Sequence, residues 1–133
     1  MVICDRESLP VSVVVESASP HEVTLVERTL TQRLTKAAPV HLVADRAYDS
    51  DPHDKLLKER FNTELISPHR KGRVKAKTQD GRKLRRYRRR WKIERLNAWL
   101  QNYRRLVTRF DYKLENFVGF VHLACILILL RHF

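Results

Sequence analysis

The sequence of 133 residues is 43% hydrophobic and 32% charged, and its net charge is +12. This length and composition predict one globular domain with a modest core. The strong positive charge favours a polyanionic partner. The most apolar run, Phe117–Leu130, is too short to span a bilayer, and residues 1–4 are too short for a targeting region. We therefore expect a cytosolic protein without a membrane partner.

The positive charge is confined to one half of the chain. Residues 1–66 carry a net charge of −3, whereas residues 67–133 carry +15. The stretch from Arg82 to Arg109 holds 12 of the 27 Lys and Arg residues and a single acid, Glu94. An isolated carboxylate among so many cations either pairs with them or has a role that needs them nearby.

The first elements are predicted to be a hairpin and a helix. Two short β-branched runs, residues 2–4 and 11–16, are separated by the turn residues DRESLP and predict paired strands. Ser19 and Pro20 form an N-cap followed by proline at the first helical position, which predicts a helix up to about residue 35.

The middle of the chain alternates strands and helices. Residues 40–44 (VHLVA) predict a buried strand that ends at Asp45, and residues 64–67 predict another. Between them, Asp51-Pro52 predicts the start of a helix up to about residue 61. A helix between two strands is typical of an α/β fold. Residues 68–81 are expected to form a polar loop.

One long helix is expected from about Arg82 to Phe110, because this stretch contains no proline or glycine. Its apolar residues recur at helical spacing and predict a buried stripe, formed by Ile93, Leu96, Leu100, Tyr103 and Val107. A neighbouring polar stripe contains Tyr87, Arg90, Glu94 and Gln101. The buried stripe fixes the rotation of the helix and so directs Glu94 toward a particular surface.

Glu94 is a candidate Mg²⁺ ligand, because hard cations prefer carboxylate oxygens and a metal on a phosphodiester needs basic groups beside it. A single carboxylate cannot hold such an ion, and the best partner is Asp45, at the carboxyl end of a predicted strand. Nearby cations suited to phosphate contacts are Arg88, Arg89, Lys92 and Arg95. The indoles of Trp91 and Trp99 either stack on bases or pack inside the protein.

These residues resemble a known family. The pattern Tyr87-x2-Arg90-x3-Glu94-x6-Gln101 resembles the Y-(2)-R-(3)-E-(6)-K signature of bacterial insertion-sequence transposases of the DDE type. The segment Asp45-Arg46-Ala47-Tyr48-Asp49 is similar to the D-R-x-Y-D segment that carries the second catalytic aspartate of that family. The resemblance covers nearly the whole chain and includes two motifs in the expected order.

The resemblance implies a ribonuclease H-like catalytic domain, a mixed sheet with flanking helices, that cuts and joins DNA strands. Its site holds two Mg²⁺ ions, with Mn²⁺ as a substitute, between two aspartates and a glutamate. Asp45 and Glu94 would be catalytic metal ligands, and Tyr87 and Arg90 would position DNA. The implied partners are transposon ends and target DNA, with self-association on the DNA and a cytoplasmic, nucleoid-associated location.

Two departures from the family pattern matter. Gln101 stands where the family has lysine, so a DNA contact is weakened. The strand that carries the first catalytic aspartate, central in the family's sheet, is absent, and Asp5 lies in a turn and does not replace it. We therefore expect a single partial domain made of residues 1–67 (strands and helices), 68–81 (loop) and 82–133 (C-terminal helices). The isolated chain is expected to be inactive, and the upstream transposase portion or full-length transposase is an expected partner.

Several alternatives remain open from the sequence. The chain is either part of a DNA-cleaving enzyme, or a non-catalytic DNA-binding truncation product that regulates or inhibits transposition, or the product of a decayed gene. Glu94 could be a surface acid paired with Arg90 or Arg95 at helical spacing. Asp45 could be an ordinary turn residue, and Asp49 and Asp51 are better explained as turn and cap residues than as metal ligands.

Overall fold

The computed structural model describes residues 1–17, 19, 21–79 and 81–132. Its elements alternate between strands and helices in the first half and are helical in the second. In chain order they are β1 (Val2–Cys4), β2 (Pro10–Val13), α1 (Glu22–Thr31), β3 (His41–Val43), the 3₁₀ helix η1 (Arg46–Tyr48), α2 (Asp51–Phe61), β4 (Glu64–Ile66), α3 (Gly81–Leu84), the 3₁₀ helix η2 (Arg85–Arg89), α4 (Trp91–Gln101), α5 (Arg104–Val107) and α6 (Leu114–Leu130). This composition confirms the α/β class.

The strands form two separate pairs. β1 and β2 are antiparallel, with Val2 opposite Val13, and β3 and β4 are parallel, with Leu42 opposite Leu65. The strands expected at 2–4, 11–16, 40–44 and 64–67 are therefore present, and the last three of them are shorter than expected. Both pairs contribute to one apolar cluster, which also includes residues of α1 and α2. Its buried members are Ile3, Val26, Leu30, Leu57 and Leu65.

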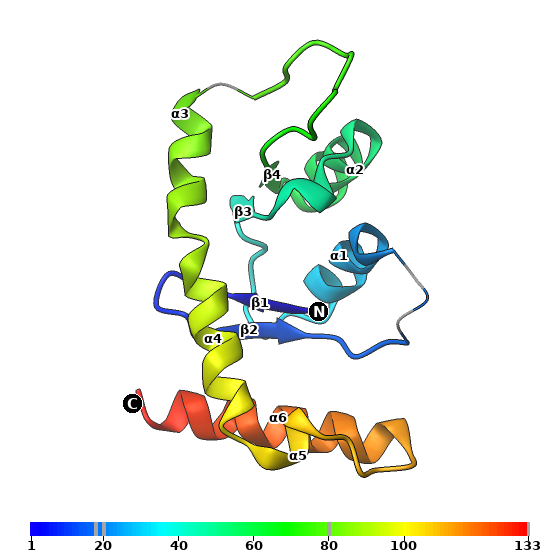
Figure 1. Cartoon of the computed structure of the whole chain (residues 1–133). Coiled ribbons are helices and arrows are strands. Elements are labelled where there is room, and N and C mark those ends of the chain that lie inside the picture. Colours follow the sequence, from blue (N-terminus) through cyan, green and yellow to red (C-terminus); the bar gives the residue numbers. More distant parts are fainter. Residues whose placement is uncertain (18, 20, 80, 133) are drawn as a thin grey trace.

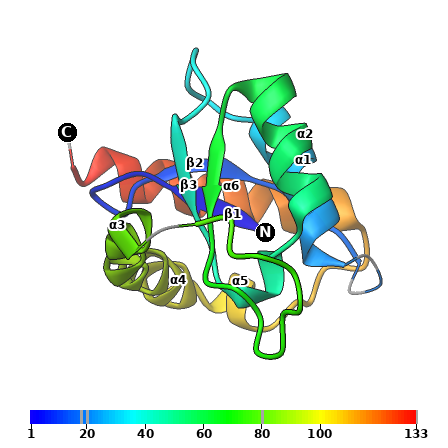
Figure 2. The same ribbon diagram turned by 90° about the horizontal axis from the view of Figure 1, so that it is seen from above.

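The strand pairs lie between two groups of helices. Helices α1 and α2 lie on one side of the strands, and the column formed by α3, η2 and α4 lies on the other (Figures 1 and 2). Helix α6 crosses one end of the molecule, where it contacts α4 and β2. This arrangement buries the strand faces in the interior and leaves the basic column at the surface.

The β1–β2 turn closes without glycine. The Asp5 carboxylate accepts hydrogen bonds from the backbone N–H groups of Glu7 (2.8 Å) and Leu9 (2.9 Å), as is usual for aspartate in turns. Ser8 adopts a left-handed conformation with φ of 71° and is fully buried. A non-glycine residue in this region needs support from its surroundings, so the turn depends on what packs against it.

The first helix begins later and ends earlier than the sequence predicted. It starts at Glu22, and His21 occupies the N-cap without a side-chain hydrogen bond, so the expected Ser19 cap is wrong. The prediction for Pro20 lies outside the described residues. Leu34, which the predicted helix included, is 74% exposed because it follows the end of the helix at Thr31. By contrast, α2 has the predicted bounds and buries Leu57.

The long basic helix is interrupted, which corrects the prediction of one continuous element. Five residues, Arg85–Arg89, form a 3₁₀ helix, and α4 ends at Gln101. A tighter turn rotates the side chains relative to the α-helical pattern, and the bend after Gln101 redirects the chain. Leu96 is completely buried as predicted, but Val107 is 61% exposed because it lies in the separate helix α5.

The apolar C-terminal segment is helical, as expected. In α6 the residues that face the interior are Val121, Ala124, Cys125 and Ile128. None of the helices within the described part of the chain combines the length and apolar character needed to cross a membrane. Cys4 and Cys125 are both free thiols, and burial raises the pKa of Cys4 to about 11.

Replacing Leu96 by alanine tests the packing of α4 against the strands. We expect Leu96→Ala to lower the free energy of unfolding by about 2–5 kcal/mol, because a fully buried leucine leaves a cavity. Leu34→Ala, at a 74% exposed position, should change it by less than about 0.5 kcal/mol. Urea unfolding measures both values, and equal effects of the two substitutions would contradict this packing.

Candidate nucleic-acid and metal site

Asp45 lies directly after β3 and caps the short helix η1. Its Oδ1 atom accepts a hydrogen bond from the Ala47 N–H at 2.9 Å, and its backbone C=O accepts one from the Tyr48 N–H at 3.2 Å. No partner is recorded for its Oδ2 atom among the residues described. The carboxylate is therefore held at the end of a strand by local bonds, with one oxygen left for another ligand.

Tyr87, Arg90 and Glu94 form a row of contacts, as the polar stripe predicted. The Arg90 Nη1 atom lies 3.5 Å from the Tyr87 hydroxyl, and its Nη2 atom lies 3.3 Å from the Glu94 Oε1 atom. The Glu94 side chain is 62% exposed, so its carboxylate remains accessible to solvent. The structure brings these three residues together although η2 and α4 differ in pitch.

The basic residues of this region fall into two groups. In the part of the chain that the structure describes, no hydrogen bond or ion pair is recorded for the side chains of four exposed arginines of η2, which are Arg85, Arg86, Arg88 and Arg89. By contrast, Lys92 and Arg95 contact the β1–β2 turn. Gln101 is exposed at the end of α4. Their roles in DNA binding stay predictions.

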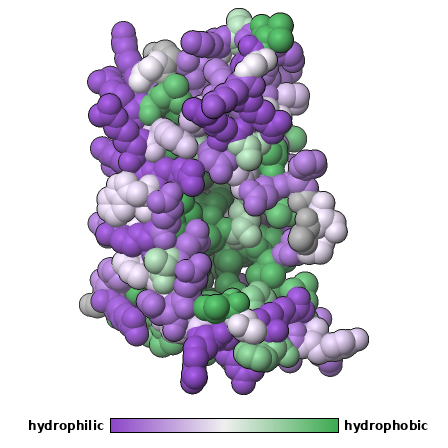
Figure 3. Space-filling view, in the orientation of Figure 1, coloured by the Kyte–Doolittle hydropathy of each residue, from purple (hydrophilic) through white to green (hydrophobic). Residues whose placement is uncertain are grey.

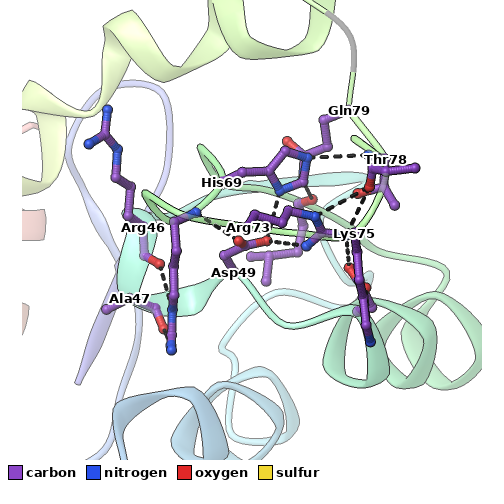
Figure 4. Close-up of polar contacts among 12 residues, drawn as sticks. Arg46, Ala47, Asp49, His69, Arg73, Lys75, Thr78 and Gln79 are labelled. Atoms are coloured by element: carbon purple, nitrogen blue, oxygen red, sulfur yellow. Dashed lines mark hydrogen bonds and ion pairs between the residues drawn. The ribbon is translucent and has the colours of Figure 1, made fainter.

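A second cluster, not predicted from the sequence, joins the loop after β4 to the segment that follows Asp45 (Figure 4). The Asp49 side chain is only 4% exposed. It lies 2.9 Å from His69 Nδ1 and accepts hydrogen bonds from Arg73 Nη1 (3.1 Å) and the Arg70 N–H (2.8 Å). Arg73 also pairs with Asp51 at 2.7 Å. We call these residues the Asp49 cluster.

The Asp49 cluster supports the helix that Asp45 caps. The Arg70 guanidinium donates to the Ala47 C=O at 2.7 Å and to the Arg46 C=O at 3.4 Å, so the loop braces η1 from outside. Gly72, at φ of 81°, allows the loop to turn back between Arg70 and Arg73. The sequence contains no local signal for this cluster, because its partners lie 20 or more residues apart. Asp49 and Asp51 are thus ion-pair partners at the end of one helix and the start of the next.

The electrostatics of this region shift several pKa values. Burial acts to raise the pKa of Asp49, but the Arg70 N–H and the His69 and Arg73 side chains outweigh it and lower that pKa. Burial, and then repulsion by Asp51 and Asp49, raises the pKa of Asp54 to about 6. Burial, and then the hydrogen bond that Tyr48 donates to Glu22, raises the pKa of Tyr48. The Asp54 carboxyl is therefore harder to ionise than an ordinary aspartate.

The metal ligands expected from the sequence are two carboxylates, Asp45 and Glu94. Within residues 1–17, 19, 21–79 and 81–132, no group of three or more His, Cys, Asp or Glu side chains could hold a metal ion. Each of the two carboxylates has a local partner, Ala47 for Asp45 and Arg90 for Glu94. Their convergence on a shared ion stays a prediction.

Comparison with known proteins identifies the family. A family model described as the transposase DDE domain matches residues 1–130, which is nearly the whole chain. The chain belongs to the DDE transposase family. It is 30% identical over 135 residues to a protein described as a transposase of insertion sequence element IS402 from Burkholderia cepacia, and 35% identical over 91 residues to one described for element IS6501 from Brucella ovis. No solved structure matches.

The DDE transposase chain matches only part of the length of these relatives. The IS402 alignment covers 96% of this chain but 60% of the relative, and the IS6501 alignment covers 68% of both. The chain thus spans about three fifths of the length of its IS402 relative. Members of this family use divalent metal ions, and the family membership confirms the resemblance drawn from the two sequence motifs.

The raised pKa of Asp54 predicts a pH-dependent substitution effect. A carboxyl whose pKa is higher in the folded than in the unfolded state costs stability above about pH 6, and this cost disappears toward pH 4. Asp54→Asn should therefore raise the melting temperature at pH 7.5 and have little effect at pH 4. Glu59→Gln, at an exposed position of the same helix, is the matched control. An Asp54→Asn effect of equal size at both pH values would contradict the assignment.

Proposed function

We propose that this chain is part of the catalytic domain of a transposase that cuts and joins DNA, and that its basic column binds DNA. The observation that carries the proposal is the Tyr87–Arg90–Glu94 row on a strongly basic surface, in a chain that matches the transposase DDE domain over residues 1–130. The isolated chain would form one partial domain in which the segment 1–67 supports Asp45 and the helices of 82–133 carry Glu94.

The proposed fold is an incomplete ribonuclease H-like sheet that lacks its central strand. This is supported by the two strand pairs, whose neighbouring strands are β1 and β3 (Figure 1). In β1 the register directs the backbone groups of Val2 and Cys4 away from β2. In β3 those of His41 and Val43 point away from β4. Two strand edges without strand partners favour the addition of a strand between them.

The surface between the two strand pairs has the character that an added strand would need. The middle of this face is hollowed and hydrophobic, between more hydrophilic regions at both ends (Figure 3). The outer edges of the two pairs are partly used instead: the Leu34 N–H donates to the Val11 C=O of β2, and the Gln79 side chain donates to the Leu65 C=O of β4. The unpaired groups are therefore concentrated on the inner edges.

The proposed metal ligands are Asp45 and Glu94, and their donor set fits the implied cofactor. Carboxylate oxygens are the ligands that Mg²⁺ prefers, and Mn²⁺ accepts the same set. Asp45 has one oxygen without a recorded partner among the residues described, and Glu94 is largely exposed. When bound, the two ions of the family would activate the attacking oxygen and stabilise the leaving one. A third carboxylate would come with the added strand.

The proposed DNA surface runs along η2 and the start of α4. Arg88 and Arg89 are exposed and available for phosphate contacts, whereas Arg90 and Tyr87 lie beside Glu94 and would hold the reacting phosphate. Gln101 would make a neutral contact where the family has lysine. Such a surface binds DNA mainly through its backbone, and we expect transposon ends and target DNA as partners at the nucleoid in the cytoplasm.

A second proposal follows from the number of carboxylates. With two of the three acids of the family site, the chain alone would bind DNA without cutting it and would regulate or inhibit transposition. It would do so by self-association on DNA or by assembly with the upstream portion or with full-length transposase.

DNA binding predicts a specific salt dependence. For a short duplex of arbitrary sequence, the logarithm of the affinity should fall linearly with the logarithm of salt concentration. Arg88→Gln should make this slope shallower by roughly 0.9, the loss of one phosphate contact. Lys58→Gln, an equal charge change on α2 across the strands from η2, is the control and should leave the slope unchanged. Fluorescence anisotropy measures both, and an affinity independent of salt would refute the proposed interface.

Mixing the chain with the missing part of a relative tests the proposed enzymatic activity. The purified chain should not nick DNA with Mg²⁺. Mixing it with the portion of the IS402 relative that it does not match should produce Mg²⁺-dependent nicking that Asp45→Ala and Glu94→Ala each abolish. Glu59→Ala serves as the control, because the Glu59 side chain is 66% exposed on α2. Nicking that survives both substitutions would place the metal site elsewhere.

A further inference from the structure

Two of the cations that the sequence suggested as phosphate contacts, Lys92 and Arg95, contact the protein itself. The Arg95 Nε atom donates to the Ser8 hydroxyl at 2.9 Å, and its Nη2 atom donates to the Glu7 C=O at 2.6 Å. The Lys92 ammonium donates to the Arg6 C=O. These bonds connect residues 86 to 88 positions apart in the chain and join α4 to the β1–β2 turn. Both donors are thus engaged on the inner side of the helix.

The aromatic contacts of Arg95 complete its surroundings. The guanidinium carbon lies 5.0 Å from the ring centroid of Trp91 and 5.0 Å from that of Trp99, so the two indoles flank it along α4. Trp99 also contacts the His132 ring, with centroids 5.2 Å apart. The Lys92 ammonium also lies over the Trp91 ring, 5.1 Å from its centroid. A planar guanidinium differs from an ammonium because it can stack its flat face on aromatic rings while its fixed fork of N–H groups donates several hydrogen bonds.

We propose that Arg95, assisted by Lys92, is a positioning residue that fixes α4 on the β1–β2 turn, rather than a phosphate ligand. The turn needs such support, because the buried Ser8 adopts a left-handed backbone conformation and its hydroxyl accepts the Arg95 bond. The proposal rests on the proposed function, since it divides the basic residues of the DNA surface into two classes.

We call the bonds of Arg95 and Lys92 to the β1–β2 turn the Arg95 clamp. The clamp determines where the neighbouring acid points. Glu94 precedes Arg95, so its side chain leaves the helix about 100° away. With Arg95 directed at the turn, Glu94 lies on the exposed side, within 3.3 Å of Arg90. Rotation of α4 would move Glu94 and Arg90 together relative to the strand that carries Asp45. Arg95 thereby acts on the candidate site through its neighbours and touches neither DNA nor metal.

Matched substitutions separate a clamp from a DNA contact. Arg95→Lys keeps the positive charge but loses the planar set of N–H donors and the stacking on the two indoles. Arg95→Gln loses the charge as well as the donors and the stacking. Both should lower the melting temperature and shift the tryptophan emission, because Trp91 and Trp99 are the chain's two tryptophans. Neither should change the salt slope of DNA binding. Arg88→Gln should instead make the salt slope of DNA binding shallower by roughly 0.9 and leave the tryptophan emission and the melting temperature unchanged.

A milder variant keeps the test decisive if the Arg95 variants fold poorly. Ser8→Ala removes one acceptor, and its effect on the melting temperature should be much smaller when Arg95 is already lysine, as expected for two residues in one interaction. The proposal is overturned if Arg95→Gln makes the salt dependence of DNA binding shallower, as Arg88→Gln does, while the tryptophan emission stays unchanged. It is also overturned if Arg95→Lys has the same melting temperature and tryptophan emission as the wild type. If the wild type does not bind DNA, the proposed function fails, but the emission and melting results still decide the clamp.

Discussion

One apolar cluster holds together two strand pairs that are not joined into one sheet. Ile3 comes from one pair and Leu65 from the other, and both pack with Val26 and Leu30 of α1 and Leu57 of α2. The position of Asp45, at the end of β3, therefore depends on side-chain packing rather than on a continuous hydrogen-bonded sheet. Hydrophobic contacts are non-directional, so the angle between the pairs is less constrained than in a complete sheet.

The helices on either side compensate for that weakness in different ways. On one side, the Asp49 cluster ties the loop after β4 to η1 and so keeps the Asp45 cap in place. On the other side, Leu96 is buried under α4 and Arg95 bonds to the β1–β2 turn. The two candidate metal ligands are thus supported by separate networks, one for each strand pair. A strand added between the pairs would turn these independent supports into parts of one framework.

Much of the local structure was predictable from the sequence, because it depends on neighbouring residues. The strands β3 and β4, the bounds of α2 and the contact between Tyr87, Arg90 and Glu94 follow from turn residues and helical spacing. The break between η2 and α4 was not predictable, since no proline or glycine marks it. The Asp49 cluster and the Arg95 clamp were missed for another reason, because their partners are distant in sequence. The sequence also does not distinguish a charged side chain that faces solvent from one that binds a buried carbonyl.

The number of cations in a chain does not by itself measure how strongly the chain binds nucleic acid. The chain carries 27 Lys and Arg residues, but each one engaged by a carboxylate or a backbone carbonyl releases fewer counterions from DNA than a free one. Arg73 neutralises Asp49 and Asp51, and Arg95 is held between two indoles. The four arginines of η2 differ because they lie on a short 3₁₀ helix that buries none of its side chains. The break in the predicted helix thus leaves exposed cations on η2, while Lys92 and Arg95 of the regular helix that follows contact the β1–β2 turn.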